Sequence, residues 1–416
     1  MMASYVIHGA CSLFLSISAC ARPAAPVATS PAAPASAPVS RSAPAPKPAA
    51  PALKMGAERF DQYLPLLRGK RVGLVVNQTS LVGRSHLADT LLAQGVAVKT
   101  IFSPEHGFRG EAADGATIKD GKDARSGLPV RSLYGATKKP TAEMLQDLDV
   151  LIFDIQDVGT RFYTYISTMH YVMEAAAEQG KSVLVLDRPN PNGFFVDGPV
   201  LEPAHKSFVG MHPIPIVHGL TVGELARMIN GEKWLAGGKQ CALTVVPVQG
   251  YTHATRYALP VRPSPNLPNA HAVALYPTLC LFEGTDVSIG RGTDAPFEVA
   301  GAPTQPRTRP YSFTPRPTPG STSPPQNGKL CYGIDLRQLP MTESSGLTLR
   351  YLIDFYQQST AKDKFFGKYF EQLTGTPTVR QQIIEGKSEQ EIRRSWEPAL
   401  GQYKQMRQKY LLYPEA

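Results

Sequence analysis

Cysteine is scarce in this chain, and none of its cysteines has the spacing of a metal site. The sequence holds five cysteines in 416 residues. After Cys20 the remaining thiols are Cys241, Cys280 and Cys331, which lie far apart and have no C-x-x-C or histidine-rich pattern beside them. We therefore expect no metal and no other cofactor, and we favour buried free thiols over one disulfide with an odd cysteine.

The signatures of several common enzyme classes are also missing. The first expected strand continues into VNQTS at residues 76–80 rather than into G-x-G-x-x-G, so a dinucleotide is not indicated. There is no P-loop and no G-x-S-x-G nucleophile elbow. The formal net charge is +9, but the basic residues form no run with interleaved aromatic residues, so nucleic acid is not an expected partner.

An apolar run long enough to span a membrane is absent as well, and only a short one lies near the N-terminus. Residues 11–17 form an apolar core, and ISAC at 17–20 follows directly, which resembles a bacterial lipobox. The pattern predicts a signal peptide over residues 1–20, a lipid on Cys20, and an exported periplasmic lipoprotein of the cell envelope. Because residues 1–10 contain no Lys or Arg, plain secretion and an uncleaved anchor stay open as alternatives.

Composition changes twice after this segment. Residues 21–53 are rich in Ala and Pro, which cannot bury a core and favours an extended, disordered linker. Such a spacer would hold a folded domain away from its membrane anchor. From residue 54 onward the composition is globular, and the remaining length is enough for two domains.

The first half of the globular region alternates short apolar runs with helical segments. Strands are expected at 71–76, 96–102, 130–133, 151–155, 182–186 and 243–248, with helices at 86–94 and 165–179. A further helix is expected after Thr221, because Thr221 and Glu224 have the spacing of a capping box. This alternation predicts an α/β fold with a mostly parallel sheet covered on both faces.

The later chain is less regular. Residues 301–327 are rich in Pro, Thr and Ser and predict an extended connection, and a strand is expected at 329–336. Helices are expected at 347–357, at 379–385 and from Glu389 to about residue 410, the last with a cap at Ser388.

Polar side chains gather where the expected strands end. They are Glu105, His106 and Arg109 after the second strand, Asp154, Asp157, Arg161 and Tyr163 after a later one, and Asn190 and Asn192 after the strand at 182–186. Because parallel strands place their carboxyl ends on one edge, we expect these residues to share a rim where a ligand binds. A carboxylate beside an imidazole, as in Glu105-His106, is suited to proton transfer.

Each of these clusters also has a structural explanation. Glu105 and His106 could brace a loop, one of the two aspartates could bond backbone, and the arginines could pair with those carboxylates. The asparagines lie in a proline-rich turn and could be turn formers. Two later clusters have equal odds of function and scaffold: His218 before the capped helix, and Glu283 with Arg291 in a glycine-rich turn.

Nine segments together resemble a known family. In chain order they are SPEHGFRG, LPVRSLYG, FDIQDVGTRFYTYISTM, LDRPNPNG, VDGPVLEP, PIPIVHGLTVGELA, PSPNLP, LYPTLCLFEGT and SIGRGT. They are similar to the NamZ-type exo-β-N-acetylmuramidase family, long catalogued only as a domain of unknown function. The match covers roughly residues 54–416, and no motif segment departs from the family pattern.

The resemblance implies a fold and an activity. It implies a Rossmann-like domain at 54–260 and a smaller α+β C-terminal domain at 261–416, with the active site in the cleft between them. The implied activity is a bacterial glycoside hydrolase that releases N-acetylmuramic acid from the non-reducing end of peptidoglycan fragments, so its partners would be muropeptides or glycan ends. The alternative is a lipoprotein that binds peptidoglycan without cleaving it.

The resemblance also suggests roles for the candidate residues. Glu105 matches the glutamate of the family's SPEHG motif and is the expected catalytic acid, with His106 tuning it or sharing its proton. For the second catalytic group we favour Asp157 over Asp154. Substrate would be bound by Arg109, Arg161 or Arg291 at the lactyl carboxylate, by Tyr163 against the sugar ring and by Asn190 and Asn192 at polar groups, with His218 and Glu283 as further candidates.

Overall fold

The computed structural model describes residues 24, 26, 52–108 and 120–415. The predicted signal peptide, the lipidation site Cys20, most of the expected linker and Arg109 lie outside the described residues. Within the described residues, no helix is both long and apolar enough to cross a membrane.

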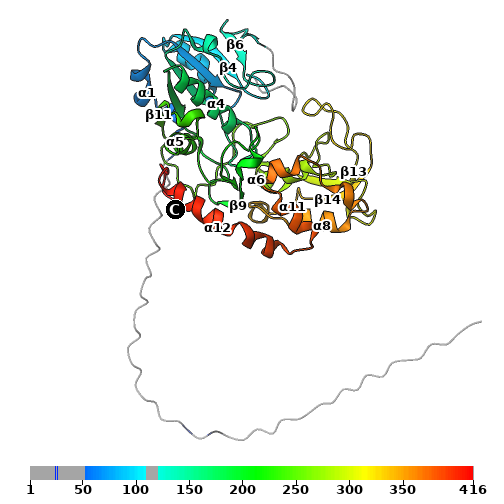
Figure 1. Cartoon of the computed structure of the whole chain (residues 1–416). Helices are drawn as coiled ribbons and strands as arrows, with labels where there is room; N and C mark the ends of the chain where they lie inside the picture. Colours follow the sequence, from blue (N-terminus) through cyan, green and yellow to red (C-terminus); the bar gives the residue numbers. More distant parts are fainter. Residues whose placement is uncertain (1–23, 25, 27–51, 109–119, 416) are drawn as a thin grey trace, which may run out of the picture. The chain divides into compact units, whose positions relative to one another are not determined.

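A seven-stranded sheet forms the centre of the N-terminal part (Figure 1). Its strands are β1 (Val72–Val76), β4 (Val98–Ser103), β5 (Gly121–Lys122), β6 (Pro129–Ser132), β7 (Val150–Asp154), β8 (Ser182–Leu186) and β11 (Ala242–Val246). The order is β11-β8-β7-β1-β4-β6-β5, and all pairs are parallel except β5 with β6. The six parallel strands therefore follow the 3-2-1-4-5-6 order of a Rossmann fold, and the predicted α/β class is confirmed.

Successive residues of the central strands enter different cores, which explains why these strands are apolar without interruption. Leu74 and Ile152 face one core, with α1 (Phe60–Leu67) and α2 (Leu87–Ala93). Val75 and Phe153 face the other, with α4 (Tyr165–Glu178) and α5 (Val222–Gly231). Helices cover both faces, so a polar residue at any of these strand positions would be buried.

The predicted cap of α5 is present. Glu224 donates its backbone N–H to the Thr221 hydroxyl over 3.2 Å, and the Glu224 carboxylate accepts the Thr221 N–H over 2.9 Å. The helix starts predicted at residues 86 and 165 also agree with α2 and α4 to within one residue. These elements could be predicted in this half of the chain because the apolar runs, the helix caps and the glycines that end the helices indicate the same boundaries.

The C-terminal part is built on a small antiparallel sheet. Its order is β12 (Val299–Ala302), β14 (Cys331–Asp335), β13 (Tyr311–Phe313). Its helices are α6 (Ala270–Leu279), α7 (Met341–Ser344), α8 (Arg350–Gln358), α9 (Lys362–Phe365), α10 (Phe370–Thr374), α11 (Thr378–Ile384) and α12 (Glu389–Gln408). The predicted strand at 329–336 and the three predicted helices are present as β14, α8, α11 and α12. The prediction for 301–327 missed β13, because proline and threonine mask a short edge strand.

Short elements complete the chain. They are α3 (Ala142–Leu145), the strand pairs β2 (Leu81–Val82) with β3 (Ser85–His86) and β9 (Asp197–Val200) with β10 (Pro215–Val217), and the 3-10 turns η1 (Gly56–Glu58), η2 (Pro203–His205), η3 (Ala236–Gly238) and η4 (Cys280–Gly284).

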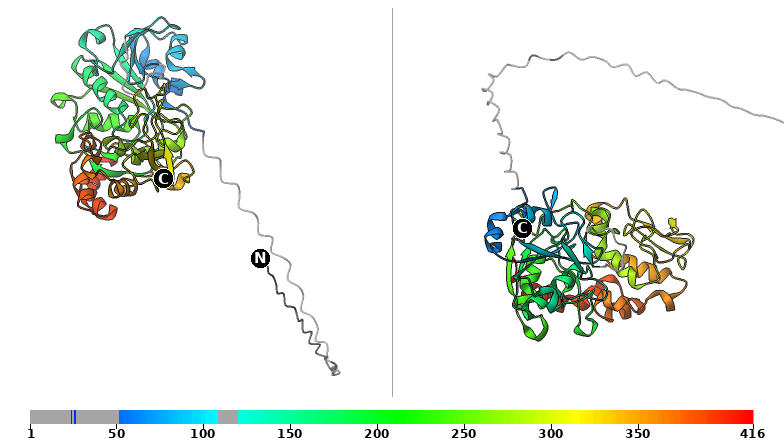
Figure 2. Two further views of the ribbon diagram at one scale, coloured as in Figure 1. Left: turned by 90° about the vertical axis from the view of Figure 1, so that its right-hand side faces the viewer. Right: turned by 90° about the horizontal axis from the view of Figure 1, so that it is seen from above.

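The two parts share one hydrophobic core and belong to one compact unit. The core runs without a break from Phe153 on β7 to Phe370 on α10 and Tyr403 on α12. The beginning and the end of the folded region also meet, because Leu53 packs with Val248, Leu412 and Tyr413 (Figure 2). The thiols of Cys241, Cys280 and Cys331 are all free and buried in this structure.

Two buried histidines link α4 to the segment before β10. Nδ1 of His170 and Nε2 of His212 lie 3.0 Å apart, and both rings are almost fully shielded from solvent. Burial lowers the pKa of His170 to about 4, and burial lowers the pKa of His212 well below its usual value. Both rings are therefore neutral in the folded protein at neutral pH.

This pair predicts a loss of stability in acid. The pKa of His170 is lower in the folded protein, about 4, than in the unfolded chain, about 6.5. Its contribution to the unfolding free energy is therefore fully present above pH 6.5 and is lost as the pH falls from about 6.5 to about 4. His170 should account for roughly 3 kcal/mol of the unfolding free energy lost across that window. Urea unfolding from pH 7.5 to 4 should show a flatter pH dependence for His170→Gln than for the wild type; identical slopes would contradict the prediction.

Candidate active site

A pocket of about 430 Å³ is lined by residues from both parts of the chain. The N-terminal part contributes Glu105, His106, Tyr134 and the segment from Phe162 to Tyr165, and the C-terminal part contributes Tyr276, Glu283, Arg291, Phe297 and Tyr369. Of the residues predicted as a site, Glu105, His106, Tyr163, Glu283 and Arg291 therefore line one pocket. Among the described residues, no group of three or more His, Cys, Asp or Glu side chains could hold a metal ion.

Glu105 lies in a tight turn directly after β4. Gly107 donates its N–H to the Pro104 carbonyl over 3.1 Å, and His106 has a φ of 67°, a left-handed conformation that is uncommon for a residue with a side chain. The turn ends the strand abruptly, which leaves Glu105 half-buried at the pocket wall. One carboxyl oxygen, Oε2, accepts a hydrogen bond of 2.7 Å from the Thr164 hydroxyl.

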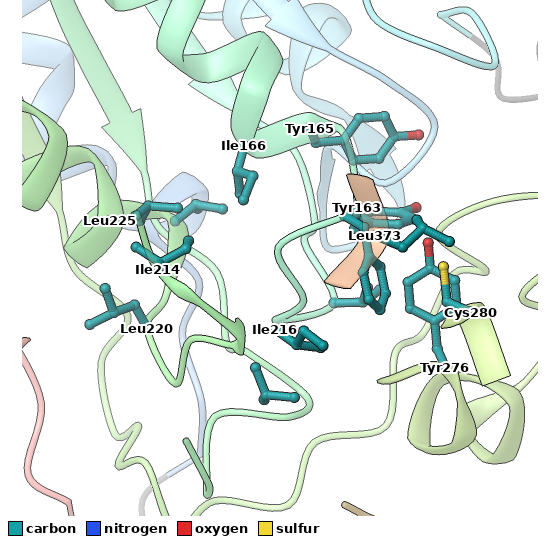
Figure 3. Packing of buried hydrophobic residues seen from close by; sticks show 14 of the residues in the cluster. Tyr163, Tyr165, Ile166, Ile214, Ile216, Leu220, Leu225, Tyr276, Cys280 and Leu373 are labelled. Atoms are coloured by element: carbon teal, nitrogen blue, oxygen red, sulfur yellow. The ribbon is translucent and has the colours of Figure 1, made fainter. Parts of the chain in front are cut away.

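The pocket that Glu105 lines also has an aromatic wall, formed by Tyr163, Tyr165 and Tyr276. Figure 3 shows these three rings among the buried residues around them. Tyr163 contacts Tyr165 and Tyr276 edge to face, with ring centroids 4.9 and 5.9 Å apart. Tyr163 and Tyr165 both donate their hydroxyls to the Pro263 carbonyl, over 2.9 and 3.3 Å. Burial raises the pKa of Tyr163 and Tyr276 well above the usual value, so these phenols stay protonated. The wall is rigid and uncharged.

Glu283 and Arg291 form a charged part of the pocket wall. Arg291 donates its Nε–H to Glu283 Oε1 over 2.7 Å, and the Cys280 thiol lies 3.4 Å from Oε2. The turn that carries Arg291 requires glycine on both sides, since Gly290 and Gly292 each have a φ of 80°. A Cβ on Gly292 would lie 2.5 Å from the Arg316 carbonyl oxygen, so a side chain there would displace the turn.

Asp154 and Asp157 do not line the pocket. Asp154 is completely buried and paired with Arg188, with nitrogen to oxygen distances of 2.6 and 2.9 Å. Asp157 is also buried; its Oδ2 accepts the Gly159 N–H over 2.6 Å and lies 3.6 Å from Nε2 of His218. Both carboxylates brace the loop after β7, so neither is proposed as a catalytic group, and His218 is likewise part of the scaffold.

Arg161 is buried in protein rather than exposed to a ligand. Its guanidinium donates to the carbonyls of Pro199, Ile214 and Leu373 at 2.7–2.9 Å. Burial lowers its pKa to about 9, so the group is still charged at neutral pH. With its guanidinium held by backbone, Arg161 is not proposed as the partner of a substrate carboxylate.

The two asparagines also bond backbone. Asn190 donates Nδ2 to the Leu220 carbonyl over 2.8 Å, and its Oδ1 accepts the Asn192 N–H over 2.8 Å. Asn192 donates Nδ2 to the Val158 carbonyl over 2.9 Å. These contacts match the turn-forming alternative, and neither residue lines the pocket.

Sequence reasoning missed several residues of the pocket. Thr164 stands next to Tyr163 in the predicted motif and directly before a predicted helix, which was an available signal. Tyr276 lies on α6, a helix that the sequence pattern did not reveal, and Phe208 and Tyr369 lie in loops without a motif. Their approach to Glu105 depends on tertiary packing alone.

Two carboxyl groups on one aromatic-walled pocket are the arrangement that glycoside hydrolases use. Family models agree with this class: residues 72–271 match the N-terminal and residues 274–413 the C-terminal model of "Exo-beta-N-acetylmuramidase NamZ". The chain belongs to the NamZ exo-β-N-acetylmuramidase family.

Individual relatives support the assignment. The chain is 40% identical over 384 residues to "Peptidoglycan beta-N-acetylmuramidase NamZ" of Bacillus subtilis (strain 168), covering 84% of this chain and 89% of the relative. Two solved structures of DUF1343 family proteins from Bacteroides fragilis NCTC 9343 are also similar. One has a TM-score of 0.82 at 48% identity, covering 88% of this chain and 100% of that protein, and the other 0.75 at 32% identity, covering 87% and 99%.

Proposed function

We propose that this protein is an exo-β-N-acetylmuramidase that hydrolyses the glycosidic bond of N-acetylmuramic acid at the non-reducing end of peptidoglycan fragments. The observation that carries the proposal is the position of Glu105, which lines a pocket with its carboxyl group held by Thr164. The name of the Bacillus relative, a peptidoglycan β-N-acetylmuramidase, supports peptidoglycan as the substrate. A pocket of about 430 Å³ is in the size range of small-ligand sites and suits the end of a glycan.

Glu105 is proposed as the general acid. Its proton moves to the glycosidic oxygen while the bond from that oxygen to the anomeric carbon breaks. A water molecule then supplies the oxygen that bonds to the anomeric carbon, and its proton goes to a second group. One water is consumed for each bond that is cleaved.

Glu283 takes the place of Asp157 as the proposed second group. Among the described residues, Glu105 and Glu283 are the carboxylates that line the pocket. The hydrogen bond from Arg291 to Oε1 orients the Glu283 carboxylate in the pocket wall. Asp157 is buried, accepts the Gly159 N–H with Oδ2, and does not line the pocket.

Arg291 is proposed to recognise the lactyl carboxylate that distinguishes muramic acid from glucosamine. Of the three arginine candidates, Arg161 is held by backbone carbonyls and Arg109 lies outside the described residues, whereas Arg291 lines the pocket. A planar guanidinium can bind Glu283 along one edge and a second carboxylate along another. Tyr163 offers an aromatic surface for the sugar ring.

We also propose that the enzyme acts in the cell envelope, where its substrate lies. The ISAC sequence at residues 17–20 supports a lipid anchor on Cys20, and the linker at 21–53 supports a tethered enzyme. These sequence patterns, together with the peptidoglycan substrate of the Bacillus relative, carry this part of the proposal.

The role of Glu105 can be tested with Glu105→Gln, which keeps the shape of the side chain but has no proton to give. On a disaccharide of N-acetylmuramic acid linked to N-acetylglucosamine, kcat should fall by about 100-fold or more, because general acid catalysis is typically worth that factor. Activity within tenfold of the wild type would exclude Glu105 as the acid. Wild-type protein that releases no nitrophenol from 4-nitrophenyl N-acetylmuramide would instead support the non-catalytic binding alternative.

The role of Glu283 can be tested with Glu283→Ala in the presence of azide. Turnover should fall by about 100-fold, as expected for loss of a catalytic base, and azide should restore part of it by attacking the anomeric carbon from the vacated space. Mass spectrometry should detect the muramoyl azide. An unchanged kcat with a raised KM would exclude Glu283 as the second catalytic group and leave it the role of positioning Arg291.

The role of Arg291 can be tested with Arg291→Lys, which keeps the charge and removes the planar fork. KM for 4-nitrophenyl N-acetylmuramide should rise about tenfold, since a charged hydrogen bond is lost. Any turnover of the matching N-acetylglucosaminide, which lacks the lactyl group, should keep its KM. Equal changes for the two glycosides would show that Arg291 does not read the lactyl carboxylate.

A further inference from the structure

We propose that Thr164 is a positioning residue that assigns the acid proton of Glu105 to one carboxyl oxygen; this inference rests on the proposed function. The Thr164 hydroxyl donates to Glu105 Oε2 over 2.7 Å. A threonine hydroxyl has a single proton, so this hydrogen bond uses its only donor. Oε2, which accepts this bond, is then the carbonyl oxygen of the protonated carboxyl group. The acid proton therefore lies on the other oxygen, Oε1.

The Thr164 hydroxyl takes no part in capping the helix that follows it. Thr164 precedes α4 with helical backbone angles, φ −70° and ψ −12°, and its side chain makes no cap hydrogen bond. A capping side chain needs an extended backbone, which Thr141, Thr221 and Ser388 have before their helices. The backbone conformation of Thr164 therefore leaves its hydroxyl to bond Glu105.

The backbone of Thr164 is well anchored, so the hydroxyl has a defined position. Its carbonyl accepts the N–H groups of Ser167 and Thr168 over 2.9 and 3.0 Å, which starts the 14-residue helix α4. The next residues, Tyr165 and Ile166, are buried in the main core. A fixed donor on a rigid helix can hold a carboxyl group at the orientation that catalysis needs.

The contact also changes during the reaction. Glu105 Oε1 transfers its proton to the glycosidic oxygen as the bond to the anomeric carbon breaks, and the carboxyl group becomes a carboxylate. A hydrogen bond to a charged oxygen is stronger than one to a neutral carboxyl group. Thr164 therefore stabilises the transition state more than the ground state, which is the requirement for a contribution to kcat.

The test compares Thr164→Val, which removes the hydroxyl at nearly constant shape, with Thr164→Ser, which keeps it. The substrates are the muramoyl disaccharide, whose leaving sugar needs a proton, and 2,4-dinitrophenyl N-acetylmuramide, whose leaving group needs almost none. Thr164→Val should lose tenfold to about a hundredfold in kcat/KM on the disaccharide and less than about threefold on the dinitrophenyl glycoside. Thr164→Ser should recover most of the loss.

Thr141→Val is the matched control, because Thr141 caps α3 through Met144 N–H over 3.3 Å and lies outside the pocket. It should lower the thermal stability without changing the ratio of kcat/KM for the two substrates. An equal loss on both substrates for Thr164→Val, or no loss on either, would overturn the positioning role while leaving the proposed function intact. A wild-type protein inactive on both substrates would overturn the proposed function and this inference with it.

Discussion

The buried guanidinium of Arg161 is the contact on which the geometry of the site depends most. It follows β7 by seven residues and binds three carbonyl oxygens, from Pro199 on β9, from Ile214 before β10 and from Leu373 on α10. A buried charge is tolerated only when it is hydrogen-bonded, and these three carbonyls accept from its two terminal nitrogens, Nη1 and Nη2. The close packing extends to Gly375, where a Cβ would lie 2.8 Å from Arg161 Nη2.

This anchor holds the chain segment that lines the pocket. Arg161 also donates its backbone N–H to the Ile216 carbonyl over 2.8 Å, so the chain is held on both sides immediately before Phe162 and Tyr163. The aromatic wall, Thr164 and the start of α4 follow in direct succession. Because α10 and the N-terminal part meet at the same guanidinium, a group that does not line the pocket joins the two parts whose residues do.

The pocket lies beside the end of β4 rather than at the crevice that the strand order indicates. In a Rossmann fold the expected ligand site is the crevice between the first and fourth parallel strands, here β1 and β7. That crevice is closed by the protein itself, since Ser80 donates to the Asp154 carbonyl and Gln156 donates its N–H to the Thr79 hydroxyl over 3.0 Å. The turn after β4 is free of this network and presents Glu105 to the C-terminal part.

The amino-acid sequence by itself determined the class of fold and the position of Glu105 directly after a strand, because β-branched runs, helix caps and the SPEHG motif are local features. Tertiary structure decided which strand-end side chains face the pocket. Glu105 and Arg161 both follow strands, yet one lines the pocket and the other is enclosed by three backbone carbonyls. Thr164 lies far along the chain from Tyr276 and Glu283, and only the shared core places them around one cavity.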